Sequence, residues 1–216
     1  MAKFTVDDFR IAYVFDIEEP ITEEKLAAGL EGKGFTVQKN RYISSSNMPV
    51  RITILNIANK GRISVLYQKD DTPTFIGLSG KDTNEVLKQF EVLGNLLQQL
   101  DPFLLQQKRY IEAVITAKVW TQSTPGKEIP KLGGDAIKKL ADSSGTNLKL
   151  ISAVISPEGS SSLEGWQMKI EQLIRNPKYY FVQYIRRSIE KKDVLADAYS
   201  SGDFITGLID QLESAK

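Results

Sequence analysis

The stretch that decides the fold spans residues 82–100 and reads DTNEVLKQFEVLGNLLQQL. Asp82 and Glu85 have the spacing of a capping box, the side-chain pattern that satisfies free amides at a helix start. Apolar side chains recur every three or four positions and share one helix face; they are Val86, Leu87, Phe90, Leu93, Leu97 and Leu100. Asp101-Pro102 ends the pattern. We expect an amphipathic helix here, with Phe90 as an anchor in the core.

The residues before this helix predict an α+β unit. Residues 9–17 are rich in β-branched and aromatic side chains, which favour a strand. Thr22 is a good N-cap for a helix that ends near Gly32 and Gly34. Asn59-Lys60-Gly61 is typical of a hairpin turn. Further strands are expected over residues 35–44, 51–58, 62–68 and 74–78.

The second half of the chain repeats this order of elements. A strand is expected over residues 110–120, and a terminal helix is expected around residues 204–212, with Leu208 as its core anchor. Between them we expect a helix over 135–142 and strands over 148–156, 166–174, 179–185 and 194–198. A shift of about 117 positions aligns the two hairpins, and a shift of about 122 aligns Ser79-Gly80 with Ser201-Gly202.

These matches predict an α+β fold of two tandem strand–helix–antiparallel sheet–helix repeats, covering residues 1–101 and 102–216. The alternative is chance, because any α+β chain matches itself at some shift.

The layout of each half resembles that of the TATA-box-binding-protein family. The resemblance is carried by Ile21–Gly32, by Met48-Pro49-Val50-Arg51-Ile52, by the hairpin, and by residues 75–81 leading into the helix. It implies a saddle whose concave sheet face meets the DNA minor groove, where paired phenylalanines wedge between base steps. The family's Phe-Pro-Gly-Leu segment is Asn47-Met48-Pro49-Val50 in this sequence. No wedge phenylalanine is therefore carried over, and the fold alone does not fix the function.

The composition excludes several classes of chemistry. Among 216 residues there are no cysteines and no histidines, which rules out disulfides, thiolate sites and histidine-based triads or zinc sites. The 28 basic and 27 acidic side chains give a net charge of +1, unlike a nonspecific nucleic-acid coat protein. With no signal peptide or membrane span in the sequence, we expect a cytoplasmic protein that does not contact membranes. We also expect no cofactor and no metal site, although carboxylates leave hard cations open. We expect a protein that is not an enzyme; the weaker alternative is an enzyme that uses carboxylates, lysines, tyrosines or serines.

Side-chain alternation along the strands divides the predicted sheet into a helix-covered face and an open face. Ile63, Val65 and Tyr67 are assigned to the covered face. The residues assigned to the open face also include Leu55, Leu66, Gln68, Gln167 and Glu171. Basic, polar and aromatic side chains on such a face suit nucleic acid, since cations meet phosphates and aromatic rings stack on bases. The predicted nucleic-acid-binding residues are Arg51, Thr53, Arg62, Ser64, Lys169, Tyr179, Phe181, Gln183, Arg186 and Arg187.

Two kinds of partner fit these patterns. The first is nucleic acid on the open face, in a binding module without enzymatic activity. The second is another protein or a second copy of the chain, because residues 179–185 are apolar on both faces and a two-sided apolar strand must be covered. A third interpretation is that the open-face residues are simply solvated.

Overall fold

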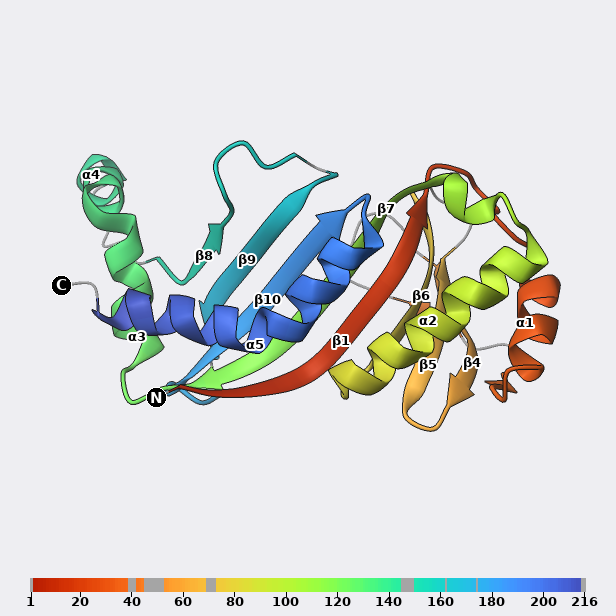
Figure 1. Cartoon of the computed structure of the whole chain (residues 1–216). Helices are drawn as coiled ribbons and strands as arrows, with labels where there is room; N and C mark the ends of the chain where they lie inside the picture. Colours follow the sequence, from red (N-terminus) through yellow and green to blue (C-terminus); the bar gives the residue numbers. More distant parts are fainter. Residues whose placement is uncertain are drawn as a thin grey trace.

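The computed structural model describes residues 2–38, 42–44, 53–68, 73–144, 150–161, 163–173 and 175–214. Within these ranges the chain forms a ten-stranded sheet with helices, which confirms the predicted α+β class (Figure 1). The elements are β1 (Lys3–Phe15), α1 (Glu23–Glu31), β2 (Thr36–Val37), β3 (Tyr42–Ser44), β4 (Thr53–Lys60), β5 (Ile63–Gln68), β6 (Thr74–Gly80), α2 (Thr83–Leu100), η1 (Leu104–Gln106), β7 (Lys108–Trp120), α3 (Pro125–Glu128), η2 (Ile129–Gly133), α4 (Gly134–Ser144), β8 (Ser152–Ile155), β9 (Gly165–Gln172), β10 (Tyr179–Ser188) and α5 (Lys191–Ser214).

The sheet is antiparallel at every described pairing, with strand order β2-β4-β5-β6-β1-β7-β10-β9-β8 and with β3 also paired to β4. The two longest strands, β1 and β7, have 13 residues each and lie side by side at the centre. Their pairing runs from Lys3 opposite Trp120 to Phe15 opposite Lys108. α1 and α4 lie at opposite ends of the sheet (Figure 1).

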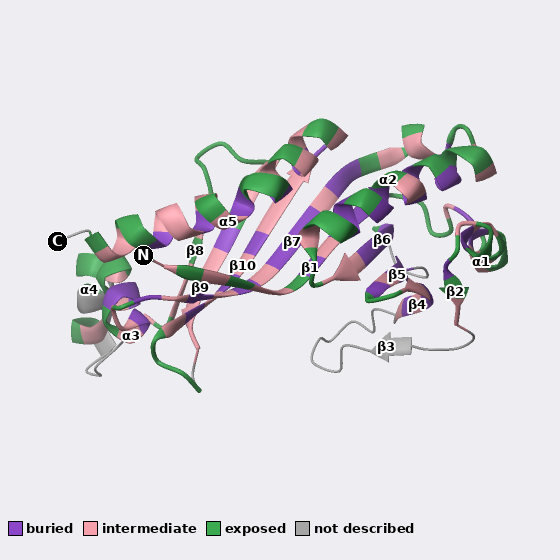
Figure 2. Cartoon of the chain, turned by 60° about the horizontal axis from the view of Figure 1, so that its bottom comes forward, coloured by how far each residue is buried: buried purple, intermediate pink, exposed green. Residues whose placement is uncertain are grey.

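Both long helices, α2 and α5, cover the same face of the sheet (Figure 2). α2 begins as the sequence predicted, since the Asp82 side chain accepts a hydrogen bond from the Glu85 amide. Phe90 is fully buried and its ring stacks on Tyr13 of β1, with the ring centroids 4.4 Å apart. Phe90 is therefore confirmed as a core anchor, whereas Leu208 is only partly buried at the edge of the core.

The predicted strand over residues 194–198 is wrong, because α5 already begins at Lys191. Val194 and Ala198 are both buried and lie one helical turn apart. Ser201, Ile205 and Ile209 continue the same buried stripe. The apolar residues of segment 194–198, which predicted a strand, are therefore the first part of this helical stripe.

Both residue alignments between the two halves are wrong. In the sheet, β6 lies next to β1 and β10 lies next to β7, so β4 and β5 hold the positions that β8 and β9 hold on the other side. The shift of about 117 instead matched β4 and β5 to β9 and β10. Ser79-Gly80 ends β6, whereas Ser201-Gly202 lies inside α5, so the second shift fails as well.

The predicted face of Leu55 is also wrong. Leu55 is 6% exposed and belongs to the helix-covered core. A β-bulge lies between Asn56 and Ala58, and both Ile57 and Ala58 point into the core. A bulge adds a residue to one strand and reverses the alternation beyond it. In β5, which has no such bulge, Ile63, Val65 and Tyr67 are buried as predicted.

Two glycine-to-alanine changes should have opposite effects on stability. A Cβ at Gly77 would lie 2.5 Å from the Ala12 Cβ and 2.5 Å from the Ile11 carbonyl oxygen, so Gly77→Ala must force β6 away from β1. We expect a loss of about 1–3 kcal/mol in the free energy of unfolding. Gly207 lies in α5 with nothing within 4 Å of such a Cβ. There the same change should stabilise by about 0.5–1 kcal/mol, since alanine is the better helix former.

Urea denaturation of the two variants beside the wild type measures both effects. Equal changes of the same sign would show that the β1–β6 contact is not as tight as the structure places it.

Alkaline pH should weaken the fold through buried tyrosines. Burial raises the pKa of Tyr184 to about 12 and also raises the pKa of Tyr13 and Tyr180. In the unfolded chain tyrosine ionises near pH 10. The folded pKa is the higher one, so this stabilisation is complete below about pH 10 and is lost as the pH rises through about 12.

The measurement is the denaturation midpoint between about pH 9 and 12, together with the absorbance of phenolate. Tyr184→Phe should reduce the alkaline loss, whereas Tyr199→Phe, at a side chain that is 61% exposed, should not. An unchanged alkaline loss in Tyr184→Phe would contradict the role given to Tyr184.

Candidate binding face of the sheet

The face opposite α2 and α5 is called the open face here. Because paired residues in neighbouring strands share a face, the register fixes which side chains it carries. On β9 and β10, Lys169 lies opposite Gln183, and Glu171 lies opposite Phe181. The residues between them, Met168, Ile170, Tyr180 and Val182, are buried under the helices. The predicted sharing of one face by Gln167, Lys169, Glu171, Tyr179, Phe181 and Gln183 is therefore confirmed.

The centre of the open face holds a carboxylate between two guanidinium groups. Glu112 of β7 accepts from Arg10 Nη2 of β1 through Oε1 at 2.9 Å, and from Arg187 Nε of β10 through Oε2 at 2.9 Å. The Glu112 side chain is 14% exposed. One acid thus joins three neighbouring strands and neutralises much of the positive charge of two bases.

Aromatic rings flank this cluster. The Arg10 guanidinium lies 5.2 Å from the centroid of Phe75, and the Arg187 guanidinium lies 5.6 Å from the centroid of Tyr110. Burial raises the pKa of the Tyr110 phenol, and the Arg187 charge opposes this rise. These contacts orient both guanidinium groups in addition to their ion pairs.

A small apolar cluster lies beside the charged centre on the same face. Leu66 and Gln68 are on the open face as predicted, but each is only 8% exposed. The Gln68 Nε2 donates to the Pro73 carbonyl oxygen at 3.0 Å. The buried members of the cluster are Ala12, Val14, Leu66, Phe75 and Tyr110, and the partly buried Ile54 and Leu163 pack on them. These five side chains are buried, so this part of the face presents little free apolar surface.

Aromatic side chains gather at the other end of β7 and β10. Trp120 lies opposite both Lys3 and Tyr179, and Phe181 lies opposite Lys118. The three aromatic residues are half-buried. The Lys3 ammonium lies 5.7 Å from the Trp120 ring centroid, and Lys118 pairs with Asp7 at 2.9 Å. This group of Lys3, Lys118, Trp120, Tyr179 and Phe181 is called the aromatic row below.

The first half of the chain contributes fewer of the predicted residues to this face. Arg51 lies outside the described residues. Thr53 is the first residue of β4, where its backbone pairs with that of Ser44. Arg62 is exposed at the turn between β4 and β5. Ser64 is half-buried on the open face, and its Oγ accepts from Asn56 Nδ2 at 3.3 Å.

Arg186 is not on the open face. It alternates with Arg187 and lies on the helix-covered side, where its Nε pairs with Asp197 of α5 and its Nη1 donates to the Gly165 carbonyl oxygen at 3.1 Å. Its side chain is 15% exposed. Arg186 therefore fastens β10 to α5, and it does not form a joint basic patch with Arg187.

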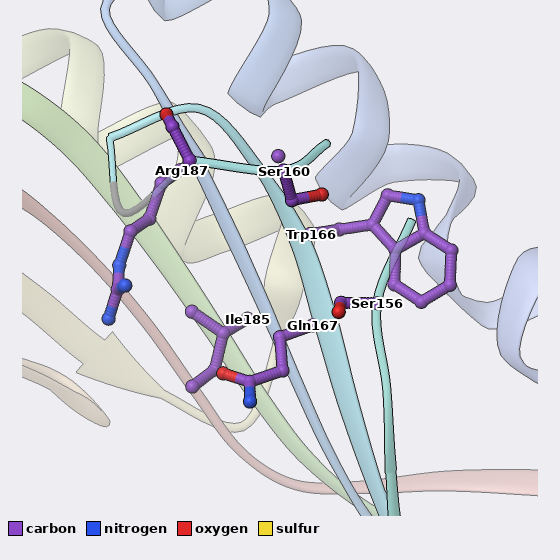
Figure 3. A pocket seen from close by; sticks show the side chains of 8 residues that line it. Ser156, Ser160, Trp166, Gln167, Ile185 and Arg187 are labelled. Carbon is purple, nitrogen blue, oxygen red and sulfur yellow. The ribbon is translucent and has the colours of Figure 1, made fainter. Parts of the chain in front are cut away.

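A pocket of about 230 Å³ opens where the loop after β8 returns to β9 (Figure 3). Arg187, Ile185 and Gln167 line it from the strands, and Ser156 and Ser160 line it from the loop. Gly165 lies opposite Arg187 and has no side chain to fill this space. The Trp166 indole points toward α5 and packs edge-on against Phe204 at 5.0 Å.

Four residues of this face were not predicted from the sequence: Arg10, Tyr110 and Glu112 at its centre, and Trp120 in the aromatic row. The signal was present, because residues 110–120 alternate in the same way as the strands that were assigned to faces. What the sequence did not reveal is that β1 and β7 are neighbours, so that residues about a hundred positions apart meet.

No protein-family model matches the sequence, and no curated protein matches it. In the described part of the chain, no helix is both long and apolar enough to cross a membrane. The same part contains no group of three or more acidic side chains arranged to hold a metal ion.

Replacing the central carboxylate should weaken the fold. Glu112→Gln removes the charge between Arg10 and Arg187 and leaves two guanidinium groups facing each other, so we expect a loss of about 1–3 kcal/mol in the free energy of unfolding. Glu171→Gln is the matched control, since Glu171 is 33% exposed and pairs with Lys169, which is 41% exposed. That change should cost less than about 1 kcal/mol.

Urea denaturation measures both variants. Equal small losses would mean that Glu112 acts as an ordinary surface charge.

Proposed function

We propose that the protein is a non-enzymatic binding module with two tandem repeats of the TATA-box-binding-protein-like fold, and that its open face receives another protein. Residues 1–101 and 102–216 are the proposed repeats.

The strand order supports the tandem repeat. Each half opens with a central strand, β1 or β7, which is followed by helical segments at the far end of the sheet. Antiparallel strands come next, and the last of them, β6 or β10, returns to pair with the central strand. A long helix then covers that half, α2 in the first and α5 in the second. This is the layout that the resemblance implies.

The charge pattern of the open face supports a protein partner. Its basic side chains are largely paired with carboxylates of the same face: Arg10 and Arg187 with Glu112, Lys118 with Asp7, and Lys169 with Glu171. A surface that binds polyanions depends on basic charge that phosphates can neutralise. A face whose basic groups are mostly paired with acids, and which carries partly buried aromatic rings, instead has the character of a protein–protein interface. This pairing is the observation that carries the proposal.

Nucleic acid is the second candidate, and the aromatic row favours it. Trp120, Tyr179 and Phe181 present rings on which bases could stack, and Lys3 and Lys118 lie beside them. The two candidates differ in how binding depends on salt, because only phosphate contacts release counterions.

A photo-crosslinking amino acid in place of Phe181 tests the lead proposal in intact cells. We expect covalent adducts that persist after nuclease treatment. The same amino acid at Tyr199 of α5, which is exposed on the helix layer, is the control and should give no such adducts. Adducts at Phe181 that nuclease treatment removes would overturn the choice of a protein partner.

Fluorescence anisotropy with labelled DNA and RNA oligonucleotides, from about 20 to 200 mM salt, completes the test. We expect no saturable binding by the wild type. If binding occurs, the second candidate predicts that Phe181→Ala weakens it without changing its salt slope, and that Arg62→Ala lowers the slope by about one. Such a pattern would replace the protein partner with nucleic acid.

A further inference from the structure

A leucine from the connection between β8 and β9 covers part of the open face. Residues 156–165 read SPEGSSSLEG, so Leu163 is the one large apolar side chain of a polar segment, which is called the arm below. Leu163 is half-buried and packs on the apolar cluster of the open face. The buried members of that cluster belong to β1, β5, β6 and β7, and β10 lies between β7 and β9 in the sheet. The arm therefore reaches back past β10 to cover a cluster that belongs mainly to the first half of the chain.

Polar contacts near the surface hold the arm in this position. Glu164 Oε1 accepts from Ser188 Oγ at 3.2 Å and from the Ile189 amide at 3.0 Å, just after the end of β10. The Ser161 Oγ accepts from the amides of Leu163 and Glu164, at 3.2 and 2.9 Å. All four hydrogen bonds lie at exposed or half-buried positions. Water can replace each of them at a small net cost.

Two glycines allow the backbone of the arm to turn. Gly159 has φ +78° and Gly165 has φ +128°, in the region that favours glycine. A pocket of about 230 Å³ lies between the serines of the arm and the side chains of Ile185 and Arg187 on β10 (Figure 3). The arm is therefore held at its end and at Leu163, and it is not packed on the sheet along its whole length.

The second side chain that covers the cluster, Ile54, is held in a different way. Ile54 lies within β4, where it is opposite Gln68 of β5 and Ile43 of β3. Its removal from the cluster requires the sheet to open. Leu163 leaves the cluster when the hydrogen bonds of Glu164 exchange with water, which is a local opening of the kind that surface loops undergo.

We propose that Leu163 is a plug of the open face. It covers the apolar cluster in the unbound protein, and the partner displaces it and inserts an apolar side chain of its own. This inference rests on the proposed function, a protein partner at the open face. The partner must then present a side chain about the size of leucine, because a leucine fills this place in the closed protein. In the unbound protein the plug shields an apolar patch that would otherwise favour nonspecific association.

Dye binding by the purified protein tests whether Leu163 covers the cluster. The dye anilinonaphthalene sulfonate fluoresces when it binds exposed apolar surface. Leu163→Ser should raise this fluorescence at least about threefold over the wild type, with the circular dichroism of the folded protein unchanged. Leu132→Ser is the matched control, since Leu132 is 44% exposed in η2, and it should bind the dye like the wild type.

A chain with the photo-crosslinking amino acid in place of both Leu163 and Phe181 tests the displacement. In the purified protein, position 163 should link internally to the strands that carry the cluster. In cells, chains that carry a nuclease-resistant adduct at position 181 should lack this internal link, whereas chains without an adduct should keep it. Digestion and mass spectrometry of the two populations measure the difference.

The outcomes separate this inference from the proposed function. Equal dye fluorescence of Leu163→Ser and the wild type would show that Leu163 does not cover the cluster. Internal links that persist in the adduct-bearing chains would show that the partner binds without displacing the arm. Either result would overturn the plug and leave the protein partner in place. The absence of nuclease-resistant adducts at position 181 would overturn the proposed function, and the displacement with it.

Discussion

The pairing of β1 with β7 is the constraint on which the rest of the structure depends. It joins the two halves along nearly the whole of two 13-residue strands. On the covered face it brings Phe9, Ile11 and Tyr13 into one core with residues of β7, so α2 and α5 pack on a shared apolar surface. On the open face it places Arg10 within reach of Glu112. The core and the candidate site are therefore both shared between the two halves.

Local patterns predicted much of the fold. The capping box and the apolar stripe located α2 almost to the residue, because both signals arise within one helix. The faces of β5, β9 and β10 followed from simple alternation. The prediction from alternation failed in β4, because a bulge between Asn56 and Ala58 reverses the alternation. The residue types in this strand do not indicate the bulge. The segment 194–198 failed because four or five apolar residues are too few to separate a strand from a helix.

The candidate site was predictable only in part, because its charges are paired over long distances in sequence. Lys169 and Phe181 were assigned to the correct face, but their charge environment depends on neighbouring strands. Arg187 was predicted to bind nucleic acid, yet it pairs with the acid Glu112, 75 positions away. Arg186 is held by Asp197 of α5, in a helix whose start was not predicted. Such contacts follow from topology, which a single sequence leaves open.

The pairing of charges also links stability to the binding that is proposed for the open face. A carboxylate between two guanidinium groups ties β1, β7 and β10 together and at the same time reduces the attraction of the face for phosphate. A sheet face that binds a polyanion would leave such guanidinium groups free to contact phosphates. In the unbound state these groups would then repel each other. In this chain Glu112 lies between the guanidinium groups of Arg10 and Arg187 and so reduces their repulsion. The face is thereby stabilised without a ligand, and the proposed protein partner would meet mainly aromatic rings, amides and hydroxyls on it.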